Sequence, residues 1–507
     1  MADARRPAVP GAITGSASNL ADLVRSAAAR AGSHTAIRAG AERVTWAELD
    51  ERVDACAGGL QRLGAVPGDR VAMLLGNGLP FVVGWFGVLR AGLVAVPVNP
   101  GYTAPEVSHQ LTDSGASVAL VEAHLASPLA GALALVPHVV VVGTQPWQEL
   151  TTLGERPSAS PRGGEDLAAL VYTSGTSGRP RGAMLTHRAL LANLDQGAAL
   201  STPVMTKDDV VLLVLPMFHI YGLNPGLGQV AAHAATGVLV DRFDPVDCLA
   251  VIQSGKITNV VGAPPMYVAW SMLPDLARSF RSVRLAVSGA APLPPDVLRR
   301  MSELTGQPVF EGYGLTETGP VLTTTLVAGE AKPGSIGRPL PGVELHLVDE
   351  QGERVDEDDP GEIVVRGQNL FSGYWPAGSD GPDADGWFAT GDVAYADADG
   401  DLHLVDRRRE LILVSGFNVY PREVETVLGE HPDVAEVAVI GIPHPYTGQS
   451  VKALIVPVPG TSPTPAELTA FAARSLARFK CPTLVELVET LPHSATGKVS
   501  KGQLRGV

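Results

Sequence analysis

The chain has 507 residues, of which 45% are hydrophobic and 18% charged, so it is long enough for several domains and is not a disordered chain. Its formal net charge of -15 argues against broad binding to nucleic acid or to anionic membranes, because both partners attract positive surface fields. Any phosphate site must therefore be local.

The first 300 residues alternate apolar runs with helical patterns. The apolar runs predict strands at 70–77, 93–99, 117–122, 138–143, 210–216, 257–265 and 283–289. Between most of them lie helical patterns such as "AELDERVDACAGGLQRLG" and "PEVSHQLTDSG". Strands that are apolar throughout, separated by helices, predict an α/β fold with parallel sheets covered on both faces.

One segment in this part, Val71 to Leu89, has no charged residue and needs weighing as a membrane span. Its "GNGLP" centre divides it into a short strand and a helix, which favours a buried strand-to-helix unit and no integral membrane segment.

The N-terminal 1–19 segment is interpreted as a loose tail rather than a signal peptide. Three distant cysteines, Cys56, Cys248 and Cys481, indicate neither a disulfide framework nor a zinc site, so a cytoplasmic location is expected.

The pattern changes in the last third of the chain. From about Gly334 to Asp406, short segments with turn residues between them predict a small antiparallel β region. After "DRRRE" at 406–410, strands and helices alternate again, with one helix beginning near Pro421. The remaining residues, about 100, are enough for a compact α+β domain.

The stretch "YTSGTSGRPRGAMLTH" at 172–187 holds hydroxyls, glycines and arginines between an apolar run and a helix-like segment. Glycines let backbone N–H groups approach an anion, hydroxyls can donate, and arginines supply charge. A surface linker has a similar composition, but the flanking patterns favour a structured strand–loop–helix that cradles phosphate. The Walker A spacing GxxxxGK[ST] is absent, so a P-loop kinase or NTPase is not indicated.

Five later stretches add chemistry: "PMFHIYGLN" (216–224), "SGAAPLP" (288–294), "EGYGLTETG" (311–319), "TGD" (390–392) and "LPHSATGKVSKGQLR" (491–505). Each has an ordinary alternative: a core histidine, plain turns, a solvated aspartate or a solvated lysine. Their order along the chain carries the argument.

Taken together, these motifs resemble the adenylate-forming superfamily of acyl-CoA synthetases, luciferases and adenylation domains. The motifs run from Tyr172 to Lys498, and the preceding residues match the expected N-terminal subdomain, so the resemblance covers nearly the whole chain. It implies a large N-terminal domain of two packed αβαβα parallel-sheet subdomains with a β-barrel-like region, and a small mobile α+β C-terminal domain. The boundaries expected are 20–406 for the AMP-binding domain (β region 334–406), 407–410 for a hinge and 411–507 for a lid.

The resemblance implies a set of nucleotide-binding residues. Asp392 would accept both ribose hydroxyls, Arg407 would approach the ribose or phosphate, and the loop from Thr173 to Gly182 would hold the departing pyrophosphate. The ATP/AMP-binding set is Thr173, Ser174, Gly175, Thr176, Ser177, Gly178, Arg181, Gly289, Ala290, Ala291, Pro292, Glu311, Gly312, Tyr313, Gly314, Asp392 and Arg407.

It also implies how catalysis is divided between the domains. Glu317 would hold Mg²⁺ and the Thr316 hydroxyl would contact a phosphate oxygen. Lys498 would catalyse adenylation as a point cation between the acid and the α-phosphate, which requires the domains to close. Coenzyme A would then attack the adenylate through a tunnel beside Ser415, Gly416 and Phe417, after rotation at Arg409.

Two residues depart from the usual pattern. Arg181 stands where the loop usually has Lys, which keeps the charge but changes the shape and reach of the donor. Arg409 stands at the hinge, where Asp or Lys is usual. We expect activity to be retained at both positions.

The class of acid substrate is inferred from the expected acyl pocket, in which His219 would gate or orient the acyl group. The residues expected to form this pocket are Tyr221, Gly262, Ala263, Gly314, Pro320 and Val321. No acidic residue stands in "FHIYG" to pair an amine, and Gly312 offers no partner for a second carboxylate, so amino acids and malonate-type acids are disfavoured. An apolar wall favours a medium- or long-chain fatty acid over a hydroxycinnamate.

Other outcomes stay open. Enzymes that transfer the acyl group to an amine or a carrier protein share these motifs. Whether CoA is consumed distinguishes a CoA ligase from such enzymes. A non-catalytic binding protein would be expected to lack Lys498 or Glu317, and both are present. The expected partners are the acid, ATP and CoA, with no nucleic acid, and the expected assembly is a monomer or a homodimer.

Overall fold

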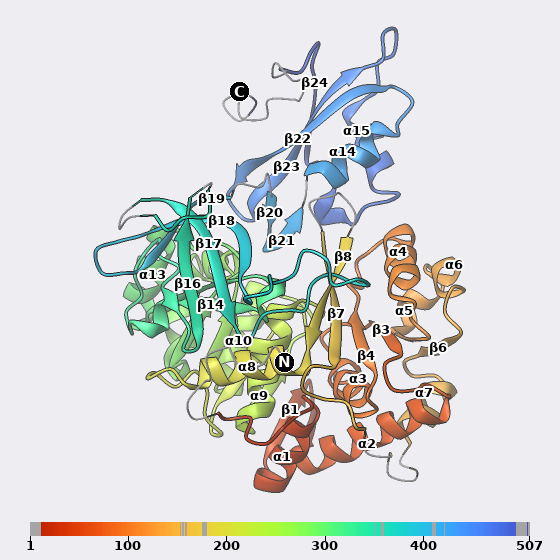
Figure 1. Cartoon of the computed structure of the whole chain (residues 1–507), viewed down its shortest axis with the longest axis vertical. Helices are drawn as coiled ribbons and strands as arrows, with labels where there is room; N and C mark the ends of the chain where they lie inside the picture. Colours follow the sequence, from red (N-terminus) through yellow and green to blue (C-terminus); the bar gives the residue numbers. More distant parts are fainter. Residues whose placement is uncertain are drawn as a thin grey trace.

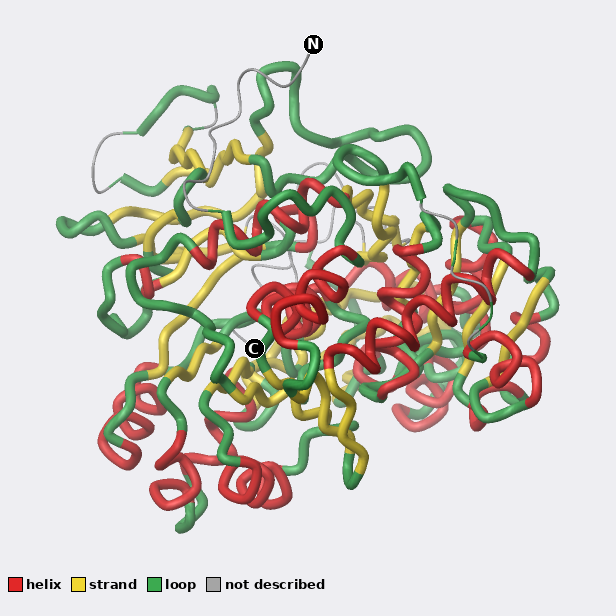
Figure 2. Tube along the Cα trace, turned by 90° about the horizontal axis from the view of Figure 1, so that it is seen from below, coloured by secondary structure: helices red, strands yellow, loops and turns green. Residues whose placement is uncertain are grey.

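The computed structural model contains two large, mainly parallel sheets, a small antiparallel sheet and a separate C-terminal sheet (Figure 1). Seen from below, helices surround the strands of the two large sheets (Figure 2). The residues that the structure describes are 12–152, 154, 157, 160–174, 180–349, 351–355, 359–407, 412–419, 421–492 and 504.

The first large sheet has six strands and comes from the N-terminal third of the chain. Its spatial order is β6 (His138–Val141), β5 (Val118–Val121), β3 (Arg70–Leu74), β4 (Val94–Pro97), β7 (Leu167–Ser174) and β8 (Pro180–Thr186). All neighbours are parallel except β8, which runs antiparallel to β7. Its helices are α2 (Trp46–Arg62), α3 (Leu79–Arg90), α4 (Ala104–Ser114), α5 (Ala123–Ala126), α6 (Ala130–Leu133) and α7 (Gln145–Thr151).

The second large sheet has nine strands and includes the first two strands of the chain. Its order is β15 (Arg338–Pro339), β14 (Val321–Thr324), β13 (Val309–Gly314), β12 (Leu285–Ser288), β11 (Asn259–Gly262), β9 (Val210–Leu213), β10 (Thr236–Leu239), β1 (Thr35–Ala39) and β2 (Glu42–Thr45). The six strands from β13 to β1 are parallel, and the strands beyond them at both edges are antiparallel.

The helices that accompany the nine-stranded sheet include a π-helix, η2 (Gly222–Gly228). The longer helices are α1 (Asp22–Ala31), α8 (His187–Ala198), α9 (Gln229–His233), α10 (Pro245–Gly255), α11 (Pro264–Ser271) and α13 (Pro295–Thr305). Short turns complete the set: α12 (Leu276–Ser279), η3 (Phe280–Ser282), η4 (Thr316–Thr318) and η5 (Thr325–Val327).

The seven strands predicted from apolar runs in the first 300 residues are all present and lie in parallel ladders, so this part of the prediction is confirmed. Local sequence explains the helix starts. Thr45 and Glu48 form a reciprocal capping box at α2, and Asp244 caps α10 through two backbone N–H groups.

The uncharged Val71 to Leu89 segment becomes strand β3 and the almost wholly buried helix α3, as predicted. Within the described parts of the chain, every helix is too short or too polar to cross a bilayer.

The segment after the opening loop differs from the prediction. We expected a strand, a loop and then a helix, but Pro180–Thr186 forms a second strand that pairs antiparallel with β7 before α8 begins. Every residue from Gly182 to Thr186 is buried. This buried run packs as a strand at the edge of the sheet, which explains why no loop forms here. The helix prediction for "RALLANL" is confirmed.

The small antiparallel sheet contains β16 (Val343–Val348), β17 (Gly361–Gly367), β18 (Phe388–Ala396) and β19 (Leu402–Arg407), in that order. The sequence predicted an antiparallel β region here, and the ladders confirm it.

The C-terminal domain is a five-stranded sheet with two helices. Its elements are β20 (Ile412–Val414), β21 (Phe417–Val419), α14 (Pro421–Gly429), β22 (Val434–His444), β23 (Gly448–Pro457), α15 (Pro465–Ala472), η6 (Arg478–Lys480) and β24 (Leu484–Leu487). Figure 1 shows this domain in blue, with β20 and β21 directed toward β7 and β8 of the large domain. Its apolar core is separate from the cores of the large domain.

Candidate active site

A deep pocket lies where the carboxyl ends of several strands of the nine-stranded sheet meet the end of β7 and the edge of β18. This is the expected place for a ligand in an open α/β sheet. The predicted site residues on its wall are Thr173, His219, Tyr221, Gly289, Ala290, Gly312, Tyr313, Gly314, Thr316, Glu317, Pro320, Val321, Asp392 and Gly416.

Other predicted residues lie elsewhere. Arg181, Gly262, Ala263, Ala291, Pro292, Glu311, Ser415 and Phe417 are described but do not line this pocket. Ser174 and Arg407 are described by their backbone only, and Gly175, Thr176, Ser177, Gly178, Arg409 and Lys498 lie outside the described residues. Their roles remain predictions.

One end of the pocket is built around Asp392. Its buried carboxylate accepts a hydrogen bond from the Tyr313 hydroxyl at 2.7 Å. The register of β18 and β19 pairs Asp392 with Arg407, so the two residues predicted to approach one ribose are backbone neighbours. A fixed carboxylate that also lines a pocket can accept hydrogen bonds from paired hydroxyls.

A second group of polar residues surrounds Glu317, and it includes two that the sequence did not indicate. The Tyr374 hydroxyl donates to Glu317 Oε1 at 2.5 Å, and the Arg181 guanidinium carbon lies 3.8 Å from the centre of the Tyr374 ring. Arg181 also pairs with Asp380 at 2.6 Å. Arg181 of the predicted phosphate loop is thus connected to Glu317, the predicted metal-binding carboxylate, through Tyr374.

Glu311 supports the wall from behind. Its carboxylate accepts a hydrogen bond from the Leu293 backbone N–H at 2.9 Å, which holds the Gly289 to Leu293 turn. Burial raises the pKa of Glu311 to about 7, although the bond from Leu293 acts in the opposite direction. The sequence grouped Glu311 with the predicted nucleotide contacts; in the structure its carboxylate is bonded to the turn from Gly289 to Leu293, and a contact with nucleotide stays a prediction.

His219 and Tyr221 both line the pocket. Burial lowers the pKa of His219 to about 4, so the imidazole is neutral at physiological pH. Its Nδ1 accepts a hydrogen bond from the Tyr221 backbone N–H at 3.2 Å. The Tyr221 hydroxyl donates to the Gly262 carbonyl at 3.3 Å, and its ring lies so close to Gly289 that a side chain there would clash at 2.8 Å.

Beyond Tyr221 the pocket continues between α8, the π-helix and the strand ends. Its wall there is mostly apolar: Leu194, Leu200, Val204, Met205, Val260, Leu285, Val287, Leu326 and Leu340. The sequence did not indicate these residues, because they come from separate elements and resemble ordinary core positions. π-helices often occur at functional sites, but η2 has no clear sequence signature.

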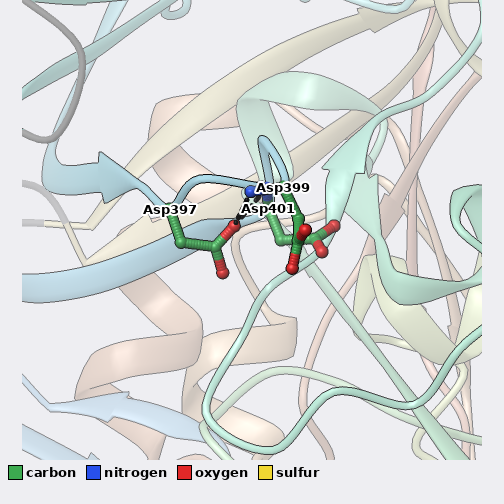
Figure 3. Close-up of side chains that lie close together, drawn as sticks. All are labelled: Asp397, Asp399 and Asp401. Atoms are coloured by element: carbon green, nitrogen blue, oxygen red, sulfur yellow. Dashed lines mark hydrogen bonds between the residues drawn. The ribbon is translucent and has the colours of Figure 1, made fainter.

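The one acidic cluster with the spacing of a metal site within the described part of the chain is elsewhere. Asp397, Asp399 and Asp401 lie in the turn after β18, where the Asp397 carboxylate accepts two backbone N–H bonds at 3.0 Å (Figure 3). The Lys332 ammonium lies 2.6, 2.8 and 3.3 Å from the three carboxylates. The lysine supplies the positive charge that a metal ion would bring, so we assign this cluster a structural role.

Comparison with known proteins fits this geometry. The AMP-binding enzyme family model matches residues 24–375, and the AMP-binding enzyme C-terminal domain model matches 423–498. A long-chain-fatty-acid–CoA ligase of Bacillus subtilis (strain 168) is 34% identical over 96% of this chain and 94% of its own length. A feruloyl-CoA synthase of an Amycolatopsis species is 38% identical over 94% of this chain and 96% of its own.

Among solved structures, an amide bond synthetase from Marinactinospora thermotolerans has a TM-score of 0.88 and 29% identity, covering 96% of this chain and 99% of its own. The family models, the relatives and the motifs in the pocket wall agree. The chain therefore belongs to the AMP-binding enzyme family, the adenylate-forming family that its motifs predicted.

Proposed function

We propose that this adenylate-forming enzyme is an ATP-dependent carboxylic acid:CoA ligase whose acid is a medium- or long-chain fatty acid. The observation that carries the proposal is a single continuous pocket. It joins the polar groups of Asp392, Thr316 and Glu317 to a long apolar wall beyond Tyr221. An adenylate of an apolar acid has this same division, with a nucleotide at one end and a hydrocarbon at the other.

The chain's own side chains would act on the two parts separately. Asp392, oriented by Tyr313, would accept the ribose hydroxyls. The neutral His219, which lines the pocket, would orient the acyl carboxyl without adding charge. Lys498 would stabilise charge at the α-phosphate, and the Thr173 to Gly182 loop would hold the leaving pyrophosphate.

The residues around Glu317 fit a magnesium ion bound together with ATP. Magnesium usually takes one or two protein carboxylates and completes its shell with phosphate oxygens and water. Glu317 offers one buried carboxylate on the wall, held in place by Tyr374, and the Thr316 hydroxyl is adjacent. When bound, the ion would neutralise phosphate charge that the protein cations alone leave uncompensated.

The fatty-acid assignment is supported by how the polar wall residues are used. Asn193, Asn259 and Thr324 line the apolar end, but each hydrogen-bonds to protein backbone. Few polar groups therefore remain for a substrate hydroxyl, which favours a plain hydrocarbon tail. The relative from Bacillus subtilis, named for long-chain fatty acids, supports the same choice.

A hydroxycinnamate is the second candidate, and one observation favours it. Gln229 lines the far end of the pocket and donates to the Leu194 carbonyl at 3.1 Å. The side-chain oxygen of Gln229, Oε1, is buried and has no hydrogen-bond partner within the described residues. This oxygen would be an acceptor for the hydroxyl of a phenolic acid, and the feruloyl-CoA synthase relative has the matching substrate class in its name.

Pyrophosphate release measured over C4 to C18 fatty acids and cinnamates tests the acid. We expect the highest kcat/KM for C8 or longer fatty acids, with Gln229→Leu leaving those values within about threefold. If cinnamates are preferred, and Gln229→Leu reduces their turnover selectively, the second candidate is correct. The same panel with amines in place of CoA tests the acceptor, because the amide bond synthetase shares the fold.

A further inference from the structure

The contact between the two domains contains a buried lysine. Lys480 belongs to the short helix η6 of the C-terminal domain, and its side chain is only 2% exposed. Its ammonium lies 2.9 Å from Glu423 on α14 of the same domain and 3.2 Å from Glu106 on α4 of the large domain. A single ammonium therefore bridges carboxylates of both domains.

Aromatic and polar contacts surround this bridge. The ammonium lies 4.9 Å from the centre of the Tyr102 ring, which precedes α4. The Thr103 hydroxyl donates to the Ser475 carbonyl across the domain boundary at 3.0 Å. Burial alone would lower the pKa of Lys480, but Tyr102 and the two carboxylates outweigh burial and raise it, so the lysine stays charged. We call Tyr102, Glu106, Glu423 and Lys480 the docking cluster.

The docking cluster is connected to the pocket through two phenylalanines. Phe479, next to Lys480, lies 6.5 Å from Tyr102 and stacks on Phe417 with ring centres 4.6 Å apart. Phe417 begins β21, directly after Gly416, and Gly416 lines the pocket. A Cβ on Gly416 would lie 3.6 Å from the Cβ of Ala290, so the loop that contains Gly416 lies against the turn from Gly289 to Leu293. The contact that docks the domain thus also places the loop at the pocket.

The chemistry of the cluster suits a contact that forms and breaks. An ammonium and two carboxylates are well hydrated when separated, so opening exposes groups that water stabilises. An apolar contact of the same size would resist separation more strongly. Once the domain docks, however, each charge needs its partner, because an unpaired buried charge is costly.

We infer that Lys480 is a positioning residue for acyl transfer: by pairing with Glu106 it docks the C-terminal domain so that the loop of Ser415, Gly416 and Phe417 reaches the pocket. The role in acyl transfer rests on the proposed ligase function, whereas the docking contact does not. The adenylation step, assigned to Lys498, would not need this contact.

Lys480→Met tests the inference because it keeps the length and the apolar stem but removes the charge. Lys452→Met is the matched control: the Lys452 side chain is also buried, with 7% of it exposed, and pairs with Glu486 at 2.8 Å, but both residues lie within the C-terminal sheet. Two rates are measured for each variant: pyrophosphate release with acid and ATP, and acyl-CoA formation from supplied acyl-adenylate. Small-angle X-ray scattering of the same samples reports how closely the domains dock.

We expect Lys480→Met to slow acyl-CoA formation at least tenfold, with pyrophosphate release within about twofold and a larger radius of gyration. Lys452→Met should change neither the ratio of the two rates nor the scattering. Glu106→Gln removes only the ion pair across the domain boundary, and it should also slow acyl-CoA formation more than pyrophosphate release. The double variant should be no worse than Lys480→Met, because the pair with Glu106 is already lost in Lys480→Met.

The inference is overturned if Lys480→Met and Lys452→Met behave alike, or if Lys480→Met slows both half-reactions equally without changing the scattering. If the wild-type enzyme transfers no acyl group to CoA, the ligase proposal fails and the acyl-transfer role with it. The scattering comparison still decides the docking contact, so the two failures can be told apart.

Discussion

The pocket and the domain contact are built from different materials. Apart from Gly416, the pocket wall comes from elements of the large domain, and most of its surface beyond Tyr221 is apolar. The domain contact instead centres on a buried ammonium and two carboxylates from both domains. Both places contain buried residues, but only the domain contact is centred on ion pairs.

This difference fits two kinds of task. Apolar packing is non-directional and stays closed, which suits a pocket that must keep its shape while the acid binds. A buried ion pair contributes little net stability but specifies one geometry, which suits a contact that must reform accurately after each opening. Variants in the two regions should therefore affect different half-reactions.

The largest expected effect is the loss of the adenylation step in Lys498→Ala. Lys498→Ala should reduce acid-dependent pyrophosphate release by about 1,000-fold, because loss of a charge at the transition state costs about 4 kcal/mol. Acyl-CoA formation from supplied acyl-adenylate should survive, the opposite of Lys480→Met. Equal loss of both steps would contradict the division between the two regions.

The next largest effect is a pH dependence of the free energy of unfolding, caused by the buried Glu311 beside the pocket. Because the pKa of Glu311 is raised to about 7 in the folded state, folding takes up a proton between pH 4.5 and 7 and stability falls as pH rises through that range. At pH 8 the buried charge should cost about 3 kcal/mol relative to pH 4. Glu311→Gln should remove this part of the pH dependence in denaturant unfolding, and the exposed Glu303→Gln on α13 should not.

A smaller effect is expected at the ribose end. Asp392→Asn keeps an acceptor for Tyr313 but removes the charge that accepts ribose hydroxyls, a loss of about 2 kcal/mol or about 30-fold in affinity. Calorimetric titration with AMP measures it. Tyr313→Phe, which leaves the carboxylate in place, should weaken AMP several-fold less than Asp392→Asn; a larger loss would mean that the tyrosine itself carries the binding.

The smallest change is Arg181→Lys. If the arginine acts only as a charge near the phosphates, activity should stay within about tenfold, about 1.4 kcal/mol. Lysine cannot stack on Tyr374 as a planar group, however, so a larger loss in kcat/KM for ATP would show that the contact leading to Glu317 is required. Asp380→Asn, which releases the arginine from its ion pair, separates the two contributions.

The sequence predicted the pocket better than the contacts around it. Apolar runs that end in Gly marked strand ends such as the one before Gly289, and the family resemblance carried by the motif order placed Gly289, Tyr313 and Glu317 at one site. The antiparallel β8 hairpin was missed, because a strand and a loop of that length look alike locally.

Tyr374 and Lys480 could not be predicted for a different reason. Each matters through partners far along the chain, Glu317 and Glu106, and neither pairing leaves a local periodicity. The same holds for the far end of the pocket, where Gln229 and the apolar wall resemble ordinary core residues.

The central claim is that this pocket makes an acyl-adenylate whose acyl group passes to CoA. Thiol loss and pyrophosphate release measured in one reaction with a long-chain fatty acid, ATP and CoA test it most directly. The account predicts equal amounts of both, with neither product formed when the acid is left out. Pyrophosphate release at the full rate without thiol loss would contradict it.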